Sequence, residues 1–108
     1  MGLRNKLAVA FLMVSITSCT SIVEGTWVAG EDRIIIDQNF DDPNTGTWEY
    51  YRGEQMIYSG DYVFNPYENQ LGFTNQLDNA SVFLGILSDK KLMFIDAAKD
   101  KTIEFEKP

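Results

Sequence analysis

The sequence predicts an all-β domain built as a small eight-stranded antiparallel up-and-down barrel, with a β-sandwich as the alternative. Residues 25–108 contain eight short runs rich in Ile, Val, Tyr, Phe and Trp, and clusters of turn-forming residues separate them. Most connections are three to seven residues long, which favours antiparallel neighbours. After Cys19, no window of eleven residues shows a convincing helical period.

The first eighteen residues differ from this pattern. Arg4 and Lys6 give a positive start, residues 7–14 are almost entirely apolar, and small or polar residues then lead to Cys19. This is the layout of a secretory signal, and the apolar stretch is too short to be a permanent membrane anchor. We therefore expect a signal peptide over 1–18, a short tether over 19–24 and a β-barrel domain over 25–108.

Cys19 is the only cysteine of the chain, and it lies at the end of this leader. A lone cysteine cannot form an internal disulfide, and a free thiol in an oxidising compartment is a liability. The motif "ITSC" at residues 16–19 resembles the lipobox of bacterial lipoproteins, although Ile16 and Thr17 depart from the commonest Leu-Ala/Ser pattern. The resemblance implies that Cys19 carries lipid, including palmitate; a plain secreted protein with a chance cysteine is the alternative.

The same resemblance implies a location in the bacterial cell envelope. Thr20 stands where many lipoproteins retained at the inner membrane have aspartate, so we expect the outer membrane, facing the periplasm.

The net negative charge of the chain argues against some classes of binding partner. The formal net charge is −7, and without Arg4 and Lys6 seven basic and sixteen acidic side chains remain, a net charge of −9. Such a surface repels phosphates, so no nucleic-acid partner is expected. Membrane contact is expected through lipid on Cys19, because no basic patch is evident in the sequence.

The predicted strands begin with two that follow the tether. Residues 25–28 open with "GTW", where the glycine lets the chain bend and Trp27 is expected to plug one end of the barrel. Residues 33–38, "RIIIDQ", contain three consecutive isoleucines, and this β-branched residue is enriched in strands.

The next two predicted strands are 46–52 and 56–64. The first repeats "GTW", and Pro43 and Pro66 fall in turns, where a missing amide does no harm. Successive side chains of a strand point to opposite faces. The inward residues expected here are Trp48, Tyr50, Tyr58, Tyr62 and Phe64.

Four further strands are predicted at residues 70–74, 81–87, 91–96 and 102–106. Alternation again assigns one face to the core. The inward set expected from these strands is Leu71, Phe73, Val82, Leu84, Ile86, Leu92, Phe94, Ile103 and Phe105.

With its lipobox, short tether, Gly25 and Trp27, and final meander over 91–107, the chain resembles bacterial lipocalin-like lipoproteins. The resemblance implies an eight-stranded up-and-down barrel with Trp27 at its closed end. The basic residue that the last lipocalin strand stacks on this tryptophan has no clear counterpart in 102–106. Avidin-like barrels also begin with Gly-Thr-Trp and remain an alternative.

The residue types present argue against catalysis. The chain has no histidine and no thiol besides Cys19, which removes the usual nucleophile–base triads and most zinc sites. Carboxylates such as Glu49, Glu54 and Asp61 are expected by chance among sixteen acids. We therefore assign no catalytic residue and no cofactor, and expect a protein that is not an enzyme.

Residues 37–48 show part of a calcium-loop pattern. Asp37, Asn39 and Asp41 have the one-three-five spacing, but Asp42 and Trp48 occupy the positions of the required glycine and bidentate glutamate. An acidic hairpin turn is the better interpretation, and no metal site is assigned.

The aromatic residues give the candidates for ligand binding. Those assigned to a cavity are Trp48, Tyr50, Tyr58, Tyr62 and Phe73. Short strands, however, usually leave an eight-stranded interior filled by side chains. We expect a lipid-anchored binding module for a small apolar or glycan-like ligand or an envelope protein. The alternative is a ligand-free structural, interaction or inhibitor protein with a filled core.

Overall fold

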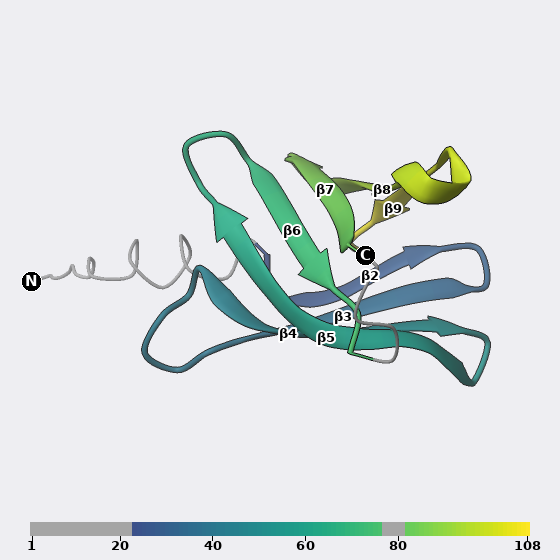
Figure 1. Ribbon diagram of the computed structural model, residues 1–108, viewed down its shortest axis with the longest axis horizontal. Coiled ribbons are helices and arrows are strands. Elements are labelled where there is room, and N and C mark those ends of the chain that lie inside the picture. Colours follow the sequence, from purple (N-terminus) through teal and green to yellow (C-terminus); the bar gives the residue numbers. More distant parts are fainter. Residues whose placement is uncertain (1–22, 77–81) are drawn as a thin grey trace, which may run out of the picture.

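The computed structural model describes residues 23–76 and 82–108, which form a closed barrel of eight antiparallel strands (Figure 1). Each strand pairs with the next along the chain, and the last returns to the first. The predicted all-β up-and-down barrel is confirmed. The predicted signal peptide and the first four residues of the tether, Cys19 included, lie outside the described residues.

The strand boundaries agree with those predicted to within one residue. The strands are β2 (Gly25–Ala29), β3 (Asp32–Gln38), β4 (Thr45–Arg52), β5 (Gln55–Asn65), β6 (Gln70–Thr74), β7 (Val82–Ser88), β8 (Lys91–Asp96) and β9 (Lys101–Glu106). A single 3-10 turn, η1 (Ala97–Lys99), joins β8 to β9 within the described part of the chain. The Asp96 carboxylate begins this turn by accepting a hydrogen bond from the Lys99 amide at 3.3 Å.

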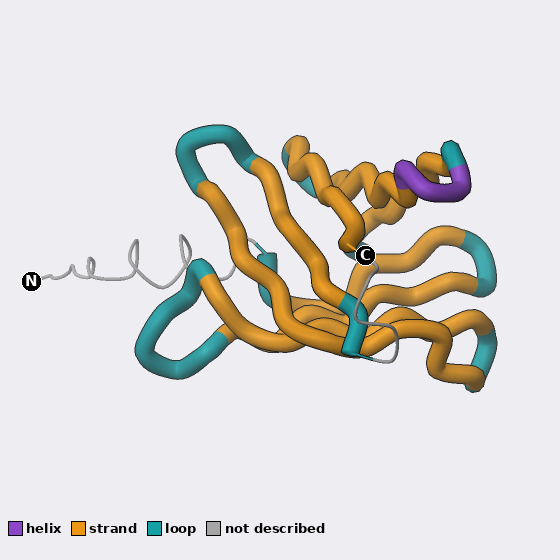
Figure 2. The backbone as a smooth tube through the Cα atoms, in the orientation of Figure 1, coloured by secondary structure: helices purple, strands orange, loops and turns teal. Residues whose placement is uncertain are grey.

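Because neighbouring strands run in opposite directions, the connections divide between two ends of the barrel (Figure 2). At the end that we call the plugged end, β2 begins and β9 finishes, and the connections at residues 39–44, 66–69 and 89–90 lie there. At the opposite end, called the open end, lie the turns at 30–31 and 53–54 and the turn η1.

Trp27 seals the plugged end together with residues from both ends of the domain. Its indole Nε1 donates a hydrogen bond to the Val23 carbonyl at 2.9 Å, and Val23 is buried in the core although the sequence placed it in the tether. The Lys107 Nζ lies 5.3 Å from the centre of the Trp27 ring. A basic residue therefore lies against Trp27, one position beyond the predicted last strand 102–106.

Aromatic rings fill the middle of the barrel. The Trp48 ring lies 4.6 Å from that of Phe73 and 5.8 Å from those of Phe83 and Phe94, centre to centre. The Trp48 Nε1 donates to the Thr74 carbonyl at 2.8 Å, which satisfies its one polar atom. Rings packed at such distances leave little interior space, as expected for short strands.

The facing predicted for β7 is wrong. Val82, Leu84 and Ile86 are 64%, 41% and 39% exposed, whereas Phe83 and Leu87 are buried. The run is almost continuously apolar, so alternation alone cannot identify its inner face. Pairing with β6 decides it, because Phe83 lies opposite the fully buried Phe73.

Candidate ligand-binding site

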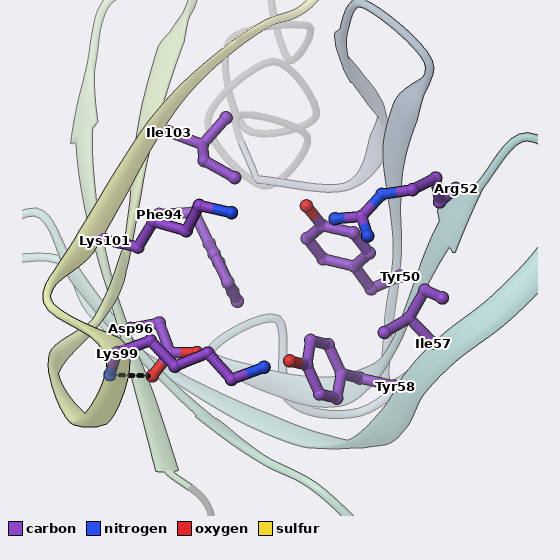
Figure 3. Close-up of a pocket in the computed structure, with 9 residues that line it drawn as sticks. All are labelled: Tyr50, Arg52, Ile57, Tyr58, Phe94, Asp96, Lys99, Lys101 and Ile103. Carbon is purple, nitrogen blue, oxygen red and sulfur yellow. Dashed lines mark hydrogen bonds between the residues drawn. The ribbon is translucent and has the colours of Figure 1, made fainter.

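A cavity of about 120 Å³ opens at the open end of the barrel (Figure 3). Strands β4, β5, β8 and β9 and the turn η1 supply its walls. The lining residues are Tyr50, Arg52, Ile57, Tyr58, Phe94, Asp96, Lys99, Lys101 and Ile103.

The side of the aromatic core that faces the open end forms the floor of the cavity. The Tyr50 ring lies 5.4 Å from that of Phe94 and 5.5 Å from that of Tyr58, the latter edge to face. Ile57 and Ile103 complete the apolar part of the lining. An apolar or planar group that entered here would therefore contact carbon on several sides.

The rim of the cavity is positively charged. Arg52, Lys99 and Lys101 contribute three cations and Asp96 one carboxylate, and the Asp32 carboxylate lies beside them as the partner of Arg52. In Figure 3 the Lys99 side chain extends toward Tyr58 and that of Lys101 toward Tyr50. The lining therefore carries more cations than carboxylates, in a chain whose formal net charge is −7.

One of these cations is already paired. The Arg52 Nε lies 3.1 Å and its Nη2 3.3 Å from the two carboxylate oxygens of Asp32, to which the Tyr50 hydroxyl also donates. Burial would raise the pKa of Asp32, but the hydrogen bonds from Arg52 and Tyr50 outweigh it and hold that pKa below 3.8. Burial, with the bond to Asp32, raises the pKa of Tyr50, so its hydroxyl stays protonated.

Neither lysine forms an ion pair with a described residue, although the charge of Lys101 helps to lower the pKa of Asp32. In the described part of the chain, ion pairs form between Arg52 and Asp32 and between Lys91 and Glu104, and neither includes Lys99 or Lys101. Both lysines are exposed, whereas the Asp96 carboxylate beside them is buried and bonded to the turn η1. The lysine ammonium groups are therefore the rim cations that no direct ion pair holds in place.

The structure brings together two of the five predicted ligand-binding residues. Tyr50 and Tyr58 line the cavity, whereas Trp48 and Phe73 are packed in the core beneath it. Tyr62 lies toward the plugged end, where its hydroxyl donates to the Pro43 carbonyl at 3.5 Å and burial raises its pKa to about 12. These five residues do not form one site.

Sequence reasoning missed the basic rim. Arg52 precedes the turn at 53–54, and Lys99 and Lys101 flank the turn between β8 and β9. In an up-and-down barrel every second turn lies at the same end, so counting strands would have placed these cations together.

Two larger hollows lie on the outer surface. One, of about 260 Å³, is lined mainly by outward-facing residues of β3, β4 and β5 and carries Asp37 and Glu49. The other, of about 430 Å³, is formed by Asn69 and residues 87–89 at the plugged end. Neither has the aromatic floor and converging charges of the open-end cavity.

Within residues 23–76 and 82–108, no three Cys, Asp or Glu side chains gather closely enough to hold a metal ion. The loop at 39–44 is an acidic turn in which the Asn39 amide donates to the Thr45 carbonyl at 2.9 Å and the Asn44 amide to the Asp42 carboxylate at 3.1 Å. No helix in the described part of the chain has the length and apolar character needed to cross a membrane.

Comparisons with protein-family models, with curated proteins and with solved structures find no match for this chain.

Proposed function

We propose that this chain is a lipid-anchored envelope protein whose open-end cavity binds an anionic group on a small ligand or on an envelope partner. The anchor is proposed from the lipobox resemblance and the solitary Cys19. Binding is proposed from one observation: three cations surround a cavity with an aromatic floor on an otherwise acidic protein.

The size of the cavity limits what enters it. Pockets that enclose a whole drug-sized ligand are roughly 300–1,000 Å³. A cavity of about 120 Å³ therefore admits one end of a molecule. A carboxylate or phosphate attached to an apolar or sugar body fits this chemistry, with the body remaining outside the barrel.

The lining residues have distinct roles in this proposal. Lys99 and Lys101 attract the anion as mobile point charges, and the Tyr58 hydroxyl offers a hydrogen bond beside them. Asp32 accepts hydrogen bonds from both Arg52 and the Tyr50 hydroxyl and so fixes the orientation of these two side chains. Phe94 and the two tyrosine rings contact the carbon atoms next to the charged group.

A second candidate is a ligand-free interaction or inhibitor protein. The packed rings of Trp48, Phe73, Phe83 and Phe94 favour it, because they leave little interior space for the body of a ligand. In that case the barrel acts through its outer surface.

Titration of the purified full chain with short-chain carboxylates, inorganic phosphate and an acidic sugar, followed by NMR, distinguishes these functions. We expect saturable shifts at the open end that are lost in the double variant Lys99→Gln with Lys101→Gln. The matched control, Lys90→Gln with Lys91→Gln, removes the same charge at the plugged end and should bind as the original does. Absence of saturable binding for every anion would support the ligand-free candidate.

The anchor is tested separately by labelling cells with radioactive palmitate. We expect label in the original chain and none in Cys19→Ala. Label that persists in Cys19→Ala would exclude lipid attachment at this residue.

A further inference from the structure

Two aromatic side chains project from the plugged end of the barrel. Phe40 in the loop 39–44 is fully exposed, and Tyr67 in the connection 66–69 is 96% exposed. Figure 1 shows these two connections protruding at the end of the barrel where β2 begins.

Both aromatics are carried by hydrogen-bonded turns. Around Phe40, the Asn39 amide donates to the Thr45 carbonyl at 2.9 Å. At the other connection, the Tyr67 amide donates to the Asn65 side-chain oxygen at 3.0 Å. The backbone thus holds both rings outward, where the described residues give them no apolar partner.

The proposed lipid on Cys19 would tie this end to a membrane. Val23 is fixed at the plugged end by its hydrogen bond from Trp27. Only four peptide steps separate Val23 from Cys19, a span of at most about 14 Å. Lipid on Cys19 would therefore hold the plugged end, and with it both aromatic turns, close to the bilayer surface.

We propose that the plugged end docks on a zwitterionic lipid surface by inserting Phe40 and Tyr67 into the interfacial layer. This inference rests on the lipid attachment proposed above. Aromatic rings are favoured at the membrane–water interface, where apolar carbon meets polar headgroups. Asp41, Asp42 and Glu68 lie next to the two rings, whereas the cations of this end, Lys90, Lys91 and Lys107, lie on other segments. The carboxylates beside the rings disfavour anionic lipids, which points to neutral headgroups.

A second apolar surface competes for the same role. Val82, Leu84 and Ile86 on β7 form a stripe on the side wall with Val63 of β5. Docking through the wall would lay the barrel on its side, whereas docking through the plugged end leaves the stripe in water. End-on docking also turns the basic cavity away from the lipid.

Single labelling sites distinguish these orientations. The lipid consumes the only natural thiol, so Phe40→Cys, Tyr67→Cys, Leu84→Cys and Glu54→Cys each give the mature protein one reactive cysteine. Each full-length variant is processed in cells, purified, labelled with an environment-sensitive fluorophore and reconstituted in phosphatidylcholine vesicles with or without a shallow spin-labelled lipid. Glu54, in the turn at the open end, is the matched control.

We expect probes at 40 and 67 to shift to shorter wavelength and to be quenched by the spin-labelled lipid. Probes at 54 and 84 should respond only to aqueous iodide. Adding anionic lipid at low salt should reduce the lipid quenching at 40 and 67, and salt should restore it. Lipid quenching at 84 in place of 40 and 67 would overturn end-on docking in favour of the wall.

The mass of each purified chain reports the anchor independently. A lipidated chain whose probes at 40 and 67 stay in water overturns the docking and leaves the proposed anchor intact. An unlipidated chain that takes up a second label on Cys19 but still inserts both probes overturns the anchor and supports the docking. A chain with neither lipid nor insertion overturns both.

Discussion

At the scale of single residues, Asp32 links the first hairpin to the rim of the cavity. One carboxylate accepts hydrogen bonds from the Tyr50 hydroxyl and from two nitrogens of Arg52. Because these bonds require the ionised form, the pKa of Asp32 is lower in the folded chain than its ordinary value of 3.8. Asp32 therefore connects the stability of the barrel to pH.

The direction of this dependence follows from proton binding. Between the lowered folded pKa and 3.8, the unfolded chain binds more protons at Asp32 than the folded chain, so stability rises with pH in this window. The contribution is complete above 3.8 and is lost as pH falls through the folded pKa. Urea unfolding between about pH 5 and 2 should show a steeper acid loss of stability in the original chain than in Asp32→Asn.

The control for this prediction is Asp61→Asn, which removes a carboxylate from an exposed position on β5. Its acid profile should follow that of the original chain. If the stability of Asp32→Asn and that of the original chain fell in parallel with pH, the hydrogen bonds to Asp32 would not contribute to the acid dependence of stability.

At the scale of elements, β7 shows how much the buried face of a strand contributes to stability. Phe83 points into the barrel, 4.6 Å from the Tyr58 ring and 5.1 Å from the Phe94 ring, whereas the adjacent Leu84 points outward. Phe83→Ala should lower the free energy of unfolding by about 3–5 kcal/mol through lost burial and a cavity. Leu84→Ala should lower it by less than about 1 kcal/mol.

Urea denaturation of the two variants measures this difference. A larger loss for Leu84→Ala would mean that β7 is turned over, with its other face toward the core.

The strands were predictable from sequence because their ends are marked locally. Gly, Asn, Asp and Pro cluster in the turns, and the runs between them have strand length and composition. The inner face of β7 was not predictable, since it depends on which residue of β6 lies opposite Phe83. Tyr50 and Tyr58 line the open-end cavity, and Lys99 joins them only through the closure of the barrel.

At the scale of the whole molecule, the two ends have opposite character. The open end carries a basic rim around the cavity, and the plugged end carries exposed Phe40 and Tyr67 among acidic residues. The two ends therefore offer different surfaces, a cavity lined by three cations at one and exposed aromatic rings at the other.

The barrel also has one weak join. Strands β2 and β9 pair at Val28 and Glu106, whereas β3 and β4 pair over seven residues. We expect hydrogen exchange, followed by NMR, to be faster for amides bonded across the β2–β9 join than for those between β3 and β4. Equal protection at both places would show that the barrel opens only as a unit.

The pairing of β2 with β9 has a consequence for folding during translation. All other neighbours are consecutive, so hairpins can form in the order in which the ribosome makes them. The barrel cannot close until β9 (Lys101–Glu106) has been synthesised, because β2 pairs with β9. The nascent chain therefore remains an open sheet until translation has passed residue 106.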